Sequence, residues 1–93
     1  MRQRHDRVAT TPPGVFLALG SAYLRAGQLP EAEREYRAAL HGNPRMGEAH
    51  NNLAYLYMVS GRLQEAEREL AQAEKKGFKV HPDFKNELKS KLH

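Results

Sequence analysis

Two clusters of glutamate are the residues best suited to chemistry, because a pair of close carboxylates can serve as general acid and general base. The glutamates stand at positions 31, 33, 35, 65, 67 and 69. Arg34, Arg37 and Arg68 lie within three or four residues of them, the spacing at which opposite charges pair on one helix face. We interpret both clusters as solvated, ion-paired helix faces and predict no catalytic carboxylate pair.

The other candidates for catalysis or metal binding lack the spacing that each chemistry needs. The segment from Gly42 to Gly47 has the Gly-x4-Gly spacing of a phosphate-binding loop, but Glu48 stands where the lysine is required. The histidines show no zinc-site spacing, and the chain has no cysteine. The serines lack the flanking residues of a nucleophile elbow. We predict no enzyme, no catalytic residue, no metal site and no cofactor.

The formal net charge of +4 is concentrated at the two ends of the 93-residue chain, which is long enough for one small domain. Residues 1–11 contribute +2, residues 12–74 contribute −2 and residues 75–93 contribute +4. Phosphate binding favours a continuous basic stripe, which this distribution does not give. We predict solvated basic tails and no nucleic-acid partner. The alternative, nucleic-acid binding through the tails, would show a steep salt dependence.

Residues 1–12 are polar, end in Thr-Thr-Pro-Pro and predict a flexible basic arm. The arginines of this arm precede an apolar run at 15–19, the order of a secretory signal, but a proline-rich spacer and Gly20-Ser21 interrupt that pattern. No apolar run approaches the roughly 18 residues that a membrane-spanning helix needs. We predict a cytoplasmic protein with no membrane association.

The chain contains an internal repeat. Residues 27–39 and 61–73 share Gly, Leu, Glu, Ala, Glu, Arg, Glu and Ala, each pair 34 residues apart. A second set of positions upstream of each segment also corresponds at this offset: Phe16, Leu19, Gly20 and Tyr23 in the first, and His50, Leu53, Ala54 and Tyr57 in the second. This correspondence predicts that the chain contains two copies of one structural unit.

This pattern resembles the tetratricopeptide-repeat family, whose unit reads Trp-x2-Leu-Gly-x2-Tyr, then Ala-x3-Phe, then an Ala and a Pro. The first unit, 13–46, matches this pattern at Phe16, Leu19, Gly20, Tyr23, Ala32, Tyr36, Ala39 and Pro44. The second unit, 47–80, matches it at Leu53, Ala54, Tyr57, Ala66, Leu70 and Ala73. The sequence departs from the pattern at His50 and Phe78, where Trp and Pro are usual. Phe78 indicates that the array ends nearby.

Apolar residues at three- and four-residue spacing predict amphipathic helices near 14–26, 30–41, 47–60, 64–76 and 82–92. Gly27 and Gly61 supply left-handed residues that end helices. The last helix, within residues 81–93, places Phe84 and Leu88 on one face and predicts a C-terminal cap. The fold class is all-α with antiparallel helix hairpins, and the resemblance implies a right-handed solenoid of two repeats plus this capping helix.

The resemblance implies that the first helix of each unit lines a concave groove that binds a protein or peptide partner. Carried over by repeat position, the partner-binding residues are Leu17, Ser21, Leu24, Arg25, Asn51, Asn52, Tyr55 and Met58. Tyr55 and Arg25 are the strongest candidates among these. Leu17, Leu24 and Val59 have the alternative role of packing between the repeats. We predict a protein-interaction module with an adaptor, scaffold or assembly role.

Self-assembly is the alternative function. Roughly three repeats are usually needed for independent stability, and this chain holds two. Either the capping helix completes the core or a second chain does. The uncapped first helix could then pack against another copy, so that a homo-oligomer would be the functional species.

Overall fold

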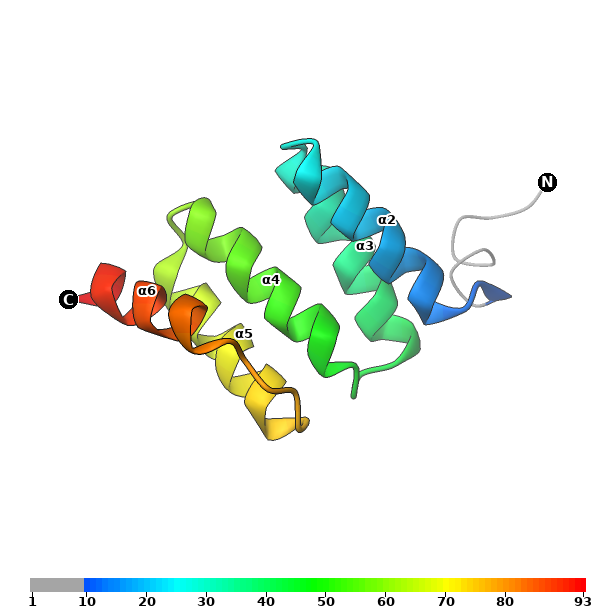
Figure 1. Ribbon diagram of the computed structural model, residues 1–93. Helices are drawn as coiled ribbons and strands as arrows, with labels where there is room; N and C mark the ends of the chain where they lie inside the picture. Colours follow the sequence, from blue (N-terminus) through cyan, green and yellow to red (C-terminus); the bar gives the residue numbers. More distant parts are fainter. Residues whose placement is uncertain (1–9) are drawn as a thin grey trace. The chain divides into compact units, whose positions relative to one another are not determined.

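The computed structural model describes residues 10–93, and in that part of the chain all the regular elements are helices (Figure 1). They are α2 (Pro13–Arg25), α3 (Leu29–Gly42), α4 (Gly47–Val59), α5 (Leu63–Lys75) and α6 (Pro82–Leu92). Each begins and ends within one residue of its predicted bounds, so the all-α prediction is confirmed. Of the predicted arm 1–12, residues 1–9 lie outside the described part.

The chain divides into two compact units. The first unit ends at Arg45 and contains α2 packed on α3. The second unit, Met46–His93, contains α4 packed on α5, with α6 packed against α5. Within each unit the successive helices run antiparallel (Figure 1). The repeat predicted from the sequence therefore corresponds to a helical hairpin.

Three helices end in the same way, at a glycine with left-handed backbone. Gly27, Gly61 and Gly77 have φ of 77°, 79° and 87°. At the end of α2 the Gly27 N–H donates to the carbonyl of Leu24 and the Gln28 N–H to that of Tyr23, at 3.0 and 2.9 Å. This is a Schellman motif, and α4 and α5 repeat it. The sequence predicted this role for two of these glycines but not for Gly77.

The first hairpin depends on the absence of a side chain at Gly20. A Cβ atom placed there would lie 2.7 Å from the Cδ1 and Cε1 atoms of Tyr36, well inside van der Waals contact. Tyr36 has no exposed surface, and its hydroxyl lies 3.0 Å from the hydroxyl of Ser21. At the corresponding positions of the second hairpin, Ala54 and Leu70 are both buried. The smaller leucine side chain leaves room for the alanine methyl group.

In the second unit a histidine stands where the repeat pattern has an aromatic residue, and this histidine pairs with a glutamate. His50 Nδ1 lies 2.8 Å from Glu69 Oε1, which joins α4 to α5. The corresponding residues of the first unit are Phe16 and Glu35, and Glu35 is only 5% exposed. Its Oε1 atom is buried without a hydrogen-bond partner among the described residues. The prediction of solvated glutamates is therefore wrong for Glu35.

The predicted cap is confirmed as a helix, and its apolar face is covered. Leu88 is 3% exposed and Phe84 is half-buried, while Lys89 and Lys91 are exposed. Lys85 Nζ lies 2.7 Å from Glu74 Oε2, so an ion pair connects α6 to the end of α5. Apolar burial holds this helix in place, and the exposed ion pair adds about 1 kcal/mol or less.

Substitution of Gly20 by alanine should lower the free energy of unfolding by about 1–3 kcal/mol, because the added methyl group displaces the Tyr36 ring from a close-packed position. Gly14→Ala is the matched control, since a Cβ atom at Gly14 meets nothing within 4 Å. That control should leave stability unchanged or raise it by up to about 1 kcal/mol, because alanine is the better helix former. Urea unfolding followed by far-UV circular dichroism measures both. Equal stability of the two variants would contradict the close approach of α2 and α3.

Candidate partner-binding surface

The eight predicted binding residues fall into two groups of four, one on α2 and one on α4. On α2, Leu17, Ser21 and Leu24 are half-buried, and Arg25 is exposed at the last helical residue. Their spacing places them on one side of the helix, next to the face on which Phe16 and Gly20 are buried. The first unit therefore presents two partly exposed leucines and an arginine on one side of α2.

Ser21 has a role within the first hairpin. Its hydroxyl is the partner of the Tyr36 hydroxyl at 3.0 Å, across α2 and α3. A buried tyrosine hydroxyl needs such a partner, because leaving it without one costs about 1–3 kcal/mol. Sequence position alone could not reveal this contact, which joins residues on two different helices.

The predicted residues of α4 differ widely in exposure. Tyr55 is 44% exposed, Asn51 and Asn52 are half-buried, and Met58 is only 3% exposed. The Oδ1 atom of Asn51 is buried, and no described residue donates a hydrogen bond to it. Met58 belongs to the core of the chain, so its side chain has little surface to offer a partner.

Tyr55 contacts the capping helix as well as solvent. Its ring lies edge-to-face against the ring of Phe84, with centroids 5.9 Å apart and an interplanar angle of 63°. This geometry is favourable for two aromatic rings. The sequence identified the apolar face of α6 that carries Phe84, but not this contact with α4.

Val59 extends the exposed apolar surface of α4. It lies one turn after Tyr55 and is 47% exposed, whereas Leu53, Leu56 and Tyr57 of the same helix are at most 1% exposed. A valine and a tyrosine that remain accessible on a helix whose other large apolar residues are buried form a small apolar surface suited to protein contacts.

Ion pairs involve some of the charged residues of α3 and α5. Arg37 pairs with Glu33 at 2.9 Å, as the sequence predicted. Arg62 pairs with Glu65 at 2.7 Å and also lies over the Tyr57 ring, 4.2 Å from its centroid. These contacts stabilise helices at positions other than the eight predicted binding residues.

Residues 10–93 contain no group of three histidine, aspartate or glutamate side chains placed to hold a metal ion. Of the helices in this range, none has the length and apolar character needed to cross a membrane.

Comparison with known proteins gave one family. The model of the tetratricopeptide repeat matches residues 17–79, more than half of the chain, from the second turn of α2 to the residues after α5. Searches of the curated proteins and of the solved structures returned no match.

A double-mutant cycle on Tyr55 and Phe84 should give a coupling energy of about 0.5–1.5 kcal/mol, because each ring loses its edge-to-face partner when the other becomes alanine. The single variants Tyr55→Ala and Phe84→Ala and the double variant are compared by urea unfolding. Tyr55→Phe, which keeps the ring, is the control and should retain the coupling. Additive effects of the two alanine substitutions would show that the Tyr55 ring does not hold α6.

Proposed function

Since the chain belongs to the tetratricopeptide-repeat family, we propose that it is an adaptor or scaffold module that binds a segment of a partner protein with the first helix of each hairpin. Repeats of this family mediate protein–protein interaction and form a non-enzymatic module. The partner segment is extended or a short helix, and it contacts side chains of α2 and of α4.

The observation that carries this proposal is the exposed apolar pair on α4. Tyr55 and Val59 are 44% and 47% exposed, and both residues lie within the matched repeat. A tyrosine provides a large apolar contact area together with a hydroxyl that can bond to a peptide. Asn51 and Asn52, on the preceding turn, add amide groups that can bond to a peptide backbone.

The corresponding surface of α2 contributes a charge. Arg25 is exposed at the end of the helix, and Leu17 and Leu24 are half-buried beside it. An arginine can bind a carboxylate with two parallel hydrogen bonds. These few side chains of α2 and α4 would bury only a small interface with a partner, and we therefore expect an affinity in the micromolar range.

The remaining parts of the proposal concern chemistry and location. We propose that the protein has no catalytic activity and no nucleic-acid partner, in line with the ion-paired glutamates of α3 and α5. A cytoplasmic location completes the proposal.

Binding is tested by capturing partners from native lysate with the intact chain and with a variant that carries Arg25→Ala and Tyr55→Ala. Captured partners should bind this variant at least about tenfold more weakly, because an aromatic and an arginine anchor are both removed. Affinity is then measured with the purified partner by fluorescence anisotropy.

Two matched variants separate binding from folding. Arg45→Ala removes an exposed arginine between α3 and α4, outside the proposed surface, and Tyr55→Phe keeps the ring against Phe84. Both should retain the partner. Partners that bind the Arg25→Ala, Tyr55→Ala variant as tightly as the intact chain would exclude α2 and α4 as the binding helices.

Self-assembly is the second candidate function, and the exposure of α2 favours it. Val15 and Leu19, one turn apart on α2, are 45% and 39% exposed. At the corresponding positions of α4, Ala49 and Leu53 are 0% and 1% exposed. An uncovered apolar side of this kind can pack against a second copy of the same helix.

The variant Leu19→Lys tests self-assembly. If the intact chain associates with rising concentration in sedimentation velocity, this variant should remain monomeric, because a charge would be buried in the interface. Its stability as a monomer should change by about 1 kcal/mol or less, since Leu19 is partly exposed. An intact chain that is monomeric at all concentrations would exclude this function and leave the partner-binding proposal standing.

A further inference from the structure

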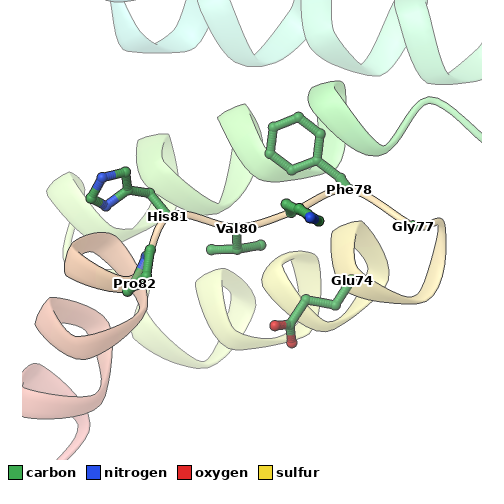
Figure 2. Close-up of a pocket in the computed structure, with 7 residues that line it drawn as sticks. Glu74, Gly77, Phe78, Val80, His81 and Pro82 are labelled. Atoms are coloured by element: carbon green, nitrogen blue, oxygen red, sulfur yellow. The ribbon is translucent and has the colours of Figure 1, made fainter.

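The stretch that joins α5 to α6 forms an open hollow in the second unit, shown in Figure 2. Its volume is about 710 Å³. The residues that line it are Glu74, Gly77, Phe78, Lys79, Val80, His81 and Pro82. This 74–82 hollow contains none of the eight residues assigned to the partner-binding surface, so it is a separate site on the molecule.

The apolar part of the 74–82 hollow is held in a fixed position. Phe78 and Val80 are half-buried, and Figure 2 shows them on the extended stretch between the two helices, with their side chains on opposite sides of the backbone. A Cβ atom on Gly47 would lie 2.8 Å from the Cβ atom of Phe78, so the start of α4 and this phenylalanine are in close contact. Proline at 82 starts α6 and limits the freedom of the stretch at its other end.

The backbone of this stretch has unused hydrogen-bond donors. The Phe78 N–H bonds to the carbonyl of Ala73, but the N–H groups of Lys79, Val80 and His81 have no partner among the described residues. An extended backbone with unpaired donors can bind an extended peptide through main-chain hydrogen bonds. The stretch therefore offers main-chain as well as apolar contacts.

The charge around the 74–82 hollow is positive. Lys79 lines the hollow, and Lys75 and Lys76 lie beside it in sequence, at the end of α5. All three lysines are exposed, and none of them forms an ion pair with a described residue. The carboxylate of Glu74 is already paired with Lys85 at 2.7 Å. Asp83 is 91% exposed and lies 3.9 Å from His81, at the α6 end. Three lysines without an ion pair thus outnumber the one carboxylate, that of Asp83, that is not paired with a lysine.

We propose that the 74–82 hollow binds an extended, acidic segment of a partner protein. An apolar side chain of that segment lies against Val80, while its carboxylates lie beside Lys79 and Lys76. Its carbonyl oxygens accept hydrogen bonds from the free N–H groups of the stretch. Charge complementarity supplies the attraction, and the apolar contact favours a protein segment that carries both kinds of side chain.

Other occupants fit these features less well. A nucleic acid or an anionic membrane would use the lysines but not the combination of an apolar hollow and unpaired backbone donors. A second copy of this chain offers its glutamates within the helices α3 and α5, where the backbone is already hydrogen-bonded. An acidic segment of a different protein satisfies all three features.

The proposal is tested with a fluorescein-labelled peptide of sequence Glu-Asp-Glu-Phe-Asp-Glu, titrated with the full chain and followed by fluorescence anisotropy. Lys76→Glu combined with Lys79→Glu should weaken binding at least about tenfold, because two attractions become repulsions. Lys89→Glu combined with Lys91→Glu changes the net charge equally on exposed residues of α6, outside the hollow, and should weaken binding by about twofold or less.

Two further measurements locate the contact without altering the core. Replacing Phe by Ser in the peptide should weaken binding, because the apolar contact is lost while the fold of the protein is untouched. In ¹H–¹⁵N correlation spectra the peptide should shift the amide signals of Lys79, Val80 and His81. Shifts confined to α2 and to residues 51–59 of α4 would overturn this proposal and support the partner-binding surface instead.

Three other outcomes would also overturn the proposal. The first is the absence of saturable binding, and the second is equal weakening by the two pairs of lysine substitutions, which would indicate unspecific attraction. The third is tighter binding to phosphatidylserine vesicles or to a single-stranded oligothymidine than to the peptide.

Discussion

The first hairpin depends on the close approach of a small residue on its first helix to a large residue on its second, and the second hairpin has a small and a large residue at the same two positions. Gly20 lies against the Tyr36 ring in the first unit, and Ala54 and Leu70 take these positions in the second. A bulkier residue on the first helix would force the pair apart and admit water to the remaining core. Because this contact occupies one face of α2 and of α4, partners can reach only the residues on their other sides.

The two hairpins share this packing but differ in their interior chemistry. The second hairpin satisfies a partly buried histidine and glutamate with each other, at 2.8 Å. The first has Phe16 in place of that histidine, and a buried oxygen of Glu35 is left without a partner among the described residues. A buried acceptor without a donor lowers stability. At the Glu35 position the first hairpin therefore carries an unfavourable contribution that the second avoids at Glu69, whereas in the second hairpin the buried acceptor without a donor is Asn51 Oδ1.

Local patterns allowed the helices and two of the turns to be predicted from the sequence, because apolar spacing and left-handed glycines act within a few residues. Contacts between helices could not be predicted in this way. Ser21 bonds to Tyr36, Tyr55 contacts Phe84, and Met58 is buried. The stretch from Phe78 to His81 has no periodic pattern, so the 74–82 hollow became visible only when the structure placed its side chains together.

The short glycine turn between α2 and α3 also has a kinetic consequence. The residues that pack within this hairpin are separated by few positions along the chain, as Gly20 and Tyr36 are. Contacts between near neighbours require little loop closure before they form, and proteins rich in them fold in microseconds to milliseconds. Synthesis adds only about 5–20 residues per second, so the pairing of α2 with α3 is fast compared with chain elongation once both helices have left the ribosome.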